Sequence, residues 1–122
     1  MICLYGGGAQ QRDFSYVDDV VEAFLMAAAS DKANGEVYNI GSGVPTSLRE
    51  AAHLCVEIAG TGSIREVEFP DDKKKIEIGN YYADYSKIGR EIGWAPRTPL
   101  REGIERTISF FRRHRRHYWE SE

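Results

Sequence analysis

Residues 13–28 read DFSYVDDVVEAFLMAA, and this stretch decides the fold class. Its apolar residues recur at positions i, i+3, i+4, i+7, i+8 and i+11, which places them on one face of a helix. Those residues are Val17, Val20, Val21, Phe24, Leu25 and Ala28. Ser15, Asp18 and Asp19 offer capping oxygens and negative charge near the helix N-terminus. The pattern predicts an amphipathic helix that starts near Val17.

Short strands are expected on both sides of this helix. Residues 2–5 form an apolar run that three consecutive glycines end. Residues 36–40 follow an Asn-Gly turn and are rich in strand-forming side chains. Residues 64–69 form a third candidate strand, which Pro70 stops. A charged loop over residues 71–75 and a short extended piece over 76–78 are expected to follow.

Three further helices are expected. Ser47 and Glu50 have the spacing of a capping box, so a helix follows Ser47. A short helix is expected from Asp84 to Ile92, and a longer one after the Thr-Pro pair at 98–99. The order of elements therefore predicts a mixed chain of the α/β (α+β) class, with short strands and about four helices. Residues 1–122 are expected to form a single domain.

Composition narrows the classes of protein. Sixteen Lys and Arg residues stand against nineteen Asp and Glu, so the net charge of −3 does not favour nucleic-acid binding. No apolar run approaches the roughly 20 residues that cross a bilayer, and the N-terminus lacks signal-peptide features. Cys3 and Cys55 form neither a metal motif nor a disulfide framework. We expect a cytoplasmic protein without a membrane segment.

No catalytic, metal or cofactor motif is complete in the sequence. The pairs Gly6/Gly8, Gly41/Gly43 and Gly60/Gly62 each lack the third glycine of a dinucleotide-binding loop. No glycine directly precedes a lysine, so there is no P-loop. The three histidines lack ligand partners at a useful spacing. We therefore assign no catalytic residue, no metal ligand and no cofactor contact to this chain.

Arg12 is the strongest candidate for binding an anion. It follows the glycine turn, where backbone N–H groups and one planar guanidinium can meet a phosphate. The alternative is a turn whose arginine pairs with a surface carboxylate, and composition alone favours that alternative. The lysines at 73–75 and the basic residues 112–117 have the same two interpretations, a solvated surface or an anion contact.

Several segments resemble one enzyme family. They are YGGG at 5–8, QRDFSYVDDVVEA at 11–23, VYNIGSG at 37–43, IGNYYADYSK at 78–87, GWAP at 93–96 and LREGI at 100–104. In this order and spacing they resemble the C-terminal portion of the extended short-chain dehydrogenases/reductases, the NAD-dependent nucleotide-sugar epimerases and dehydratases.

The resemblance implies a chain that lacks its enzyme's catalytic half. Family members bind NAD through a glycine-rich Rossmann loop and move a proton with a Tyr-x-x-x-Lys pair; this sequence has neither. It therefore implies the substrate-binding part of an epimerase or dehydratase, with no NAD bound by this chain and no activity alone. By position, Arg12 matches the family arginine at the substrate diphosphate, and Lys73 or Lys75 matches a second basic contact. Asn80 stands where many relatives have Asp.

The resemblance also implies partners. The expected ligand is a UDP-, dTDP- or GDP-sugar. Without a Rossmann domain, the apolar face of the helix after Val17 and the edge of strand 36–40 would be uncovered. We therefore expect a homodimer or larger homo-oligomer. The alternative function is a stand-alone interaction module that uses this uncovered face; nucleic acid is the least favoured partner.

Overall fold

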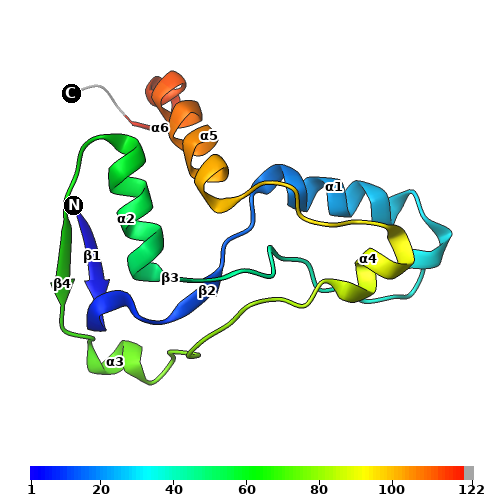
Figure 1. Cartoon of the computed structure of the whole chain (residues 1–122), viewed down its shortest axis with the longest axis horizontal. Coiled ribbons are helices and arrows are strands. Elements are labelled where there is room, and N and C mark those ends of the chain that lie inside the picture. Colours follow the sequence, from blue (N-terminus) through cyan, green and yellow to red (C-terminus); the bar gives the residue numbers. More distant parts are fainter. Residues whose placement is uncertain (120–122) are drawn as a thin grey trace.

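The computed structural model describes residues 1–119, in which short strands and helices alternate (Figure 1). The strands are β1 (Ile2–Tyr5), β2 (Gln11–Asp13), β3 (Pro45–Ser47) and β4 (Ile64–Val67). The helices are α1 (Val17–Ala28), α2 (Leu48–Ala59), α3 (Asp71–Lys74), α4 (Ser86–Ile92), α5 (Leu100–Arg113) and α6 (Arg115–Tyr118). The predicted α/β class is confirmed. Figure 1 shows an elongated arrangement with α1 and α4 at one end and β1, β4 and α2 at the other.

Two separate two-stranded sheets hold the chain together. β1 pairs in parallel with β4, in a register that places Ile2 opposite Ile64 and Tyr5 opposite Val67. β2 pairs antiparallel with β3, with Arg12 opposite Thr46. The strands predicted at 2–5 and 64–69 are thus confirmed, although the second ends at Val67.

Three sequence-based predictions in the loops are wrong. Residues 36–40 form no strand, because no other described segment lies along their backbone to accept or donate a ladder of hydrogen bonds. Val37 is 81% exposed there. The extended piece expected at 76–78 is not formed as a unit, because Ile76 lies in the turn that follows α3 and residues 77–78 belong to no strand. The loop predicted at 71–75 contains α3, whose acidic first turn and basic last turn suit the helix dipole.

The helix ends are set mostly by local contacts. At α2 the capping box forms: the Glu50 amide donates to Ser47 Oγ over 3.1 Å, and the Ser47 amide donates to Glu50 Oε2 over 2.9 Å. The helix ends at Gly60, whose φ of 67° favours glycine. α1 has Tyr16 at its N-cap and no side-chain cap, so the expected capping role of Ser15 is wrong.

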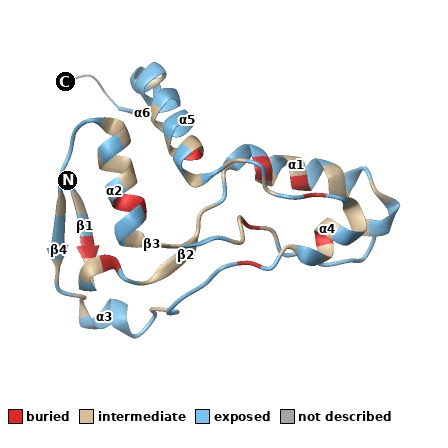
Figure 2. Cartoon of the chain, in the orientation of Figure 1, coloured by how far each residue is buried: buried red, intermediate tan, exposed pale blue. Residues whose placement is uncertain are grey.

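The main hydrophobic cluster joins α1 to α4 and the loop after it. Ala23, Ile88 and Trp94 are each 2% exposed, and the partly buried residues packed on them are Met26, Tyr38, Ile40, Tyr85 and Ile92. The Trp94 indole donates to the Asp19 carbonyl over 3.0 Å. Few other positions are buried, as Figure 2 shows.

The opposite side of α1 is uncovered. Val17, Phe24 and Leu25 are 62%, 66% and 66% exposed, and Val21 is 47% exposed. This is the face that, by the family resemblance, is expected to lose its cover without a Rossmann domain. Among residues 1–119, no helix is long and apolar enough to cross a membrane.

Candidate functional site

The candidate site lies on β2, which has β3 on one side and residues 77–83 on the other. The amide of Tyr81 donates to the Gln11 carbonyl over 3.1 Å, and the Gln11 amide donates to Asn80 Oδ1 over 2.9 Å. The amide of Ala83 donates to Asp13 Oδ2 over 3.0 Å. These contacts fix the backbone on both sides of Arg12, so they define where its side chain begins.

Arg12 is held by residues 77–79, which follow the turn at 75–76. Its Nη1 donates to the carbonyls of Gln11, over 2.8 Å, and of Gly79. Its Nη2 donates to the carboxylate of Glu77 and forms an ion pair with it. Gly79 has a φ of 74°, which favours glycine at this position. About a quarter of each charged side chain stays exposed, 24% for Arg12 and 25% for Glu77.

The ion pair keeps Glu77 charged. The hydrogen bond from Arg12 lowers the pKa of Glu77 below its usual value, and the positive charge of Arg12 and the Gly79 and Ile78 amides lower it further. Partial burial acts in the opposite direction and is outweighed. The site therefore holds a guanidinium and a carboxylate at neutral pH, and the two charges balance.

The other predicted site residues are placed differently. Asn80 lies beside Arg12, but its Oδ1 accepts from the Gln11 backbone. Lys73 lies at the Tyr5 side chain, with Nζ 3.3 Å from the hydroxyl and 4.5 Å from the ring centroid. Lys75 is exposed after α3. The structure thus brings Arg12 and Asn80 together and places Lys73 against β1.

Sequence reasoning missed Glu77, which makes the closest charged contact of Arg12. One signal could have indicated it: Glu77 alternates with the apolar Ile76 and Ile78 directly before a turn glycine. An extended segment with that alternation turns its carboxylate to the side opposite the two isoleucines. The residue that this carboxylate contacts, Arg12, lies 65 positions earlier in the chain, so the local pattern could not identify it.

Asp13 stabilises the backbone beside Arg12. Its carboxylate accepts from the amides of Ser42, over 2.7 Å, and Gly43, over 3.0 Å, as well as from Ala83. Burial by itself raises the pKa of Asp13, but the hydrogen bonds from Ser42, Ala83 and Gly43 outweigh it and lower the pKa below its usual value. A Cβ at Gly41 would lie 2.5 Å from Asp13 Oδ2, so only glycine fits there.

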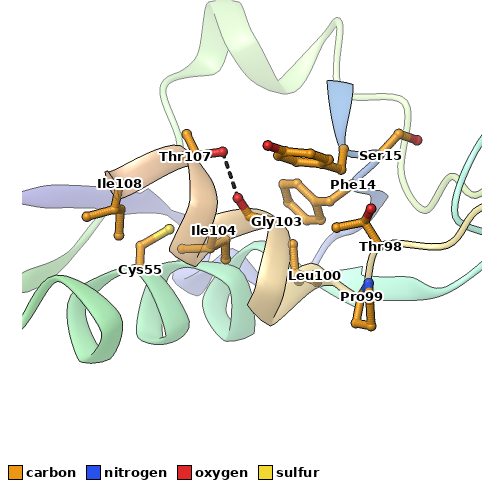
Figure 3. Close-up of a pocket in the computed structure, with 11 residues that line it drawn as sticks. Phe14, Ser15, Cys55, Thr98, Pro99, Leu100, Gly103, Ile104, Thr107 and Ile108 are labelled. Atoms are coloured by element: carbon orange, nitrogen blue, oxygen red, sulfur yellow. Dashed lines mark hydrogen bonds between the residues drawn. The ribbon is translucent and has the colours of Figure 1, made fainter. Parts of the chain in front are cut away.

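A separate pocket lies between α2, α5 and the end of β2 (Figure 3). It has a volume of about 220 Å³ and is lined by Phe14, Ser15, Tyr16, Cys55, Thr98, Pro99, Leu100, Gly103, Ile104, Thr107 and Ile108. The Thr107 hydroxyl donates to the Gly103 carbonyl over 2.7 Å. None of these lining residues has a charged side chain, so the pocket does not suit a phosphate. Within residues 1–119, no cluster of His, Cys, Asp and Glu could hold a metal ion.

Comparison with known proteins defines the class. The family model described as GDP-mannose 4,6 dehydratase matches residues 1–107. The chain belongs to this family of nucleotide-sugar epimerases and dehydratases, within the extended short-chain dehydrogenases/reductases, as the sequence resemblance predicts.

Individual relatives agree with this assignment. The chain is 37% identical over 119 residues to a dTDP-glucose 4,6-dehydratase of Streptomyces griseus, covering 96% of this chain and 34% of the relative. It is 37% identical over 110 residues to a UDP-glucose 4-epimerase of Mycolicibacterium smegmatis, covering 89% of this chain and 34% of the relative. The chain thus spans about a third of the length of the relatives it matches, and the match falls in their C-terminal third.

Solved structures share the fold. A UDP-glucose 4-epimerase from Thermotoga maritima, solved with UDP-glucose, superposes with a TM-score of 0.80 at 32% identity, over 93% of this chain and 35% of that one. A dTDP-glucose 4,6-dehydratase from Streptomyces venezuelae, with NAD and TYD bound, also has a TM-score of 0.80 at 32% identity, over 97% and 35%.

Proposed function

We propose that this chain is the substrate-binding part of an NAD-dependent nucleotide-sugar epimerase or dehydratase, with Arg12 as the contact to the substrate diphosphate. One observation carries the proposal: Arg12 is a partly exposed guanidinium that two backbone carbonyls hold in place beside the β2 strand. A planar guanidinium positioned in this way suits two phosphate oxygens. Relatives with solved structures were crystallised with UDP-glucose and with TYD, which supports a diphosphate ligand.

Lys73, Lys75 and Asn80 complete the proposed site. The two lysines precede the segment that holds Arg12, and both are exposed enough to approach an anion. A lysine adds a point charge but cannot grip two oxygens as an arginine does. Asn80 lies next to Arg12 and offers its side-chain NH₂ group, since only its oxygen bonds to Gln11.

The proposal includes no catalysis by this chain alone. The sequence contains neither the glycine-rich loop for NAD nor the Tyr-x-x-x-Lys pair that moves the proton in the family. Chemistry would therefore require a dinucleotide-binding domain, which would hold NAD and the reacting sugar carbon. A cytoplasmic location agrees with two cysteines that are both free.

Calorimetry with UDP-, dTDP- and GDP-sugars tests the site. We expect Arg12→Ala to weaken binding of the preferred ligand by about tenfold or more, because hydrogen bonds to charged groups are worth about 1.5–3 kcal/mol. Arg49→Ala is the matched control, since Arg49 forms a comparable ion pair with Glu66 on α2 and β4. Binding that is absent, or that Arg12→Ala leaves unchanged, would reject the proposed function.

A second candidate function is an interaction module. It is favoured by the exposed face of α1, formed by Val17, Val21, Phe24 and Leu25, and by the unpaired segment 36–40 nearby. Such a face is covered in a stable assembly, either by a dinucleotide-binding domain or by a second copy. Light scattering of the chain alone, and then of the chain co-expressed with the N-terminal two-thirds of a relative, separates these partners. A monomer that captures neither would contradict this candidate and the expected homo-oligomer.

A further inference from the structure

Arg12 already has an anion, and that anion belongs to the chain itself. The Glu77 carboxylate is bound to Nη2 of the guanidinium, and Nη1 is bound to two backbone carbonyls. A guanidinium that is already neutralised attracts a second anion much less than a free one does. A ligand at Arg12 must therefore either tolerate Glu77 or replace it.

The two halves of the contact are anchored very differently. Arg12 Nη1 donates to the carbonyl of Gln11, on its own strand, and to that of Gly79, two residues after Glu77. Glu77 has Ile76 and Ile78 as neighbours, which are 76% and 70% exposed, so little packing holds its segment. Its amide makes a long bond of 3.4 Å to the Lys74 carbonyl, and its carboxylate accepts from the Gly79 amide over 3.1 Å. Replacement would therefore break the bond from the Gly79 amide as well as the ion pair, while the Gln11 carbonyl on β2 still holds Nη1 of Arg12.

A carboxylate with one negative charge is a weaker partner for this site than a diphosphate. Three lysines, at 73–75, lie two to four residues before Glu77 and add positive charge to the same segment, although Lys74 pairs with Asp71. A diphosphate carries at least two charges and offers more acceptor oxygens than the single carboxylate. The pKa of Glu77 lies below its usual value, so at neutral pH the carboxylate is an ionised competitor and not a neutral neighbour.

We propose that Glu77 is an internal competitor: it occupies Arg12 in the free chain, the diphosphate of the nucleotide sugar displaces it, and this exchange sets the affinity of the site. The inference rests on the proposed function of Arg12 and adds the residue that opposes binding. In this role Glu77 sets affinity and takes no part in chemistry.

Calorimetry with two probes, inorganic pyrophosphate and dTDP-glucose, tests the exchange on the full chain. We expect Glu77→Gln to bind pyrophosphate about five- to tenfold more tightly than the unmodified chain, since it loses one ion pair and one repulsion. The control is Glu66→Gln, which removes another partly exposed Arg–Glu pair, Arg49–Glu66 at 2.7 Å, and should change affinity less than about twofold. Circular dichroism confirms that each variant is folded.

The double variant Arg12→Ala/Glu77→Gln distinguishes competition from a general charge effect. If Glu77 competes for Arg12, the gain disappears in the double variant, which then binds pyrophosphate no better than Arg12→Ala. A gain that persists without Arg12, unchanged or weaker binding by Glu77→Gln, or no pyrophosphate binding by any variant would overturn the proposal. If dTDP-glucose shows no Arg12-dependent binding while the pyrophosphate series behaves as expected, the proposed function fails and the exchange stands.

Discussion

Helix α1 has two faces with opposite environments. The face formed by Asp19, Ala23 and Met26 packs on the Trp94 cluster, and its first two members are 6% and 2% exposed. The face that includes Phe24 and Leu25 is the more hydrophobic, yet each of these side chains is 66% exposed. The comparison teaches that the side of a helix with the larger apolar residues need not be the side that its own chain covers.

The largest effect is expected at the covered face. Trp94→Ala should lower the free energy of unfolding by about 3–5 kcal/mol, because it empties the centre of the cluster and removes the indole bond to the Asp19 carbonyl. Urea unfolding followed by circular dichroism measures the loss. Trp119→Ala is the control, since Trp119 is 54% exposed and should cost less than about 0.5 kcal/mol. Equal losses for the two tryptophans would contradict the placement of the core.

Asp19 should give the next effect. Its carboxylate accepts from the amides of Arg97, over 3.2 Å, and Thr98, over 2.9 Å, and from the Thr98 hydroxyl over 3.0 Å. Asp19→Ala leaves these donors without their acceptor at a buried position, which should cost about 2–3 kcal/mol. Its neighbour Asp18 is exposed in the same helical turn, so Asp18→Ala should cost less than about 1 kcal/mol. Similar losses would mean that Asp19 acts only on the helix dipole.

Sequence reasoning performed well where structure is decided locally. The capping box of Ser47 and Glu50 was predictable because both partners lie within four residues. The helix beginning at Val17 was predictable from its period alone. Asp19 shows where this stops: as an acidic residue in a first helical turn it looks like Asp18, and only contacts 78 and 79 positions away distinguish the two.

The strand predicted at 36–40 is absent, and Glu77 was not predicted as the partner of Arg12. Both errors have a related cause. Residues 36–40 have strand-like composition, but a strand exists only where a second backbone pairs with it, and no described segment does so. The role proposed for Arg12 comes from the family resemblance and stays a prediction, whereas the carboxylate that meets Arg12 comes from a loop 65 positions later. Pairing between distant segments is the information that a single sequence does not contain.

Asp13 joins β2 to the loops at Ser42 and Ala83 and should make the chain sensitive to acid. Because its pKa is lowered on folding, its stabilisation is present above the usual value and is lost as the pH falls through the folded value. The free energy of unfolding should thus decrease below about pH 4. Asp13→Asn should cost about 1–2 kcal/mol at pH 7 and flatten this decrease. Urea midpoints at several pH values measure both; Asp72→Asn, on α3, controls for the lost charge.

The smallest effect is expected at the exposed face of α1, and two adjacent substitutions test it. Phe24→Ser removes a large side chain that is 66% exposed, while Ala23→Ser adds one hydroxyl where the residue is 2% exposed. Both place serine in the same helix, so burial is the main difference. We expect less than about 0.5 kcal/mol for Phe24→Ser and about 1 kcal/mol for Ala23→Ser, because a buried hydroxyl without a partner is costly.

Which of the two variants loses more unfolding free energy shows what covers the face of Phe24 and Leu25. Urea midpoints of both variants at low and at high protein concentration separate folding from association. If Phe24→Ser costs more than Ala23→Ser only at high concentration, a second copy covers the face of Phe24 and Leu25, as the expected homo-oligomer requires. If Phe24→Ser costs more at every concentration, the same chain covers this face and the contrast between the two sides of α1 is wrong. If the smaller loss stays with Phe24→Ser throughout, the face is open in the isolated chain, and its apolar surface remains available to a dinucleotide-binding domain.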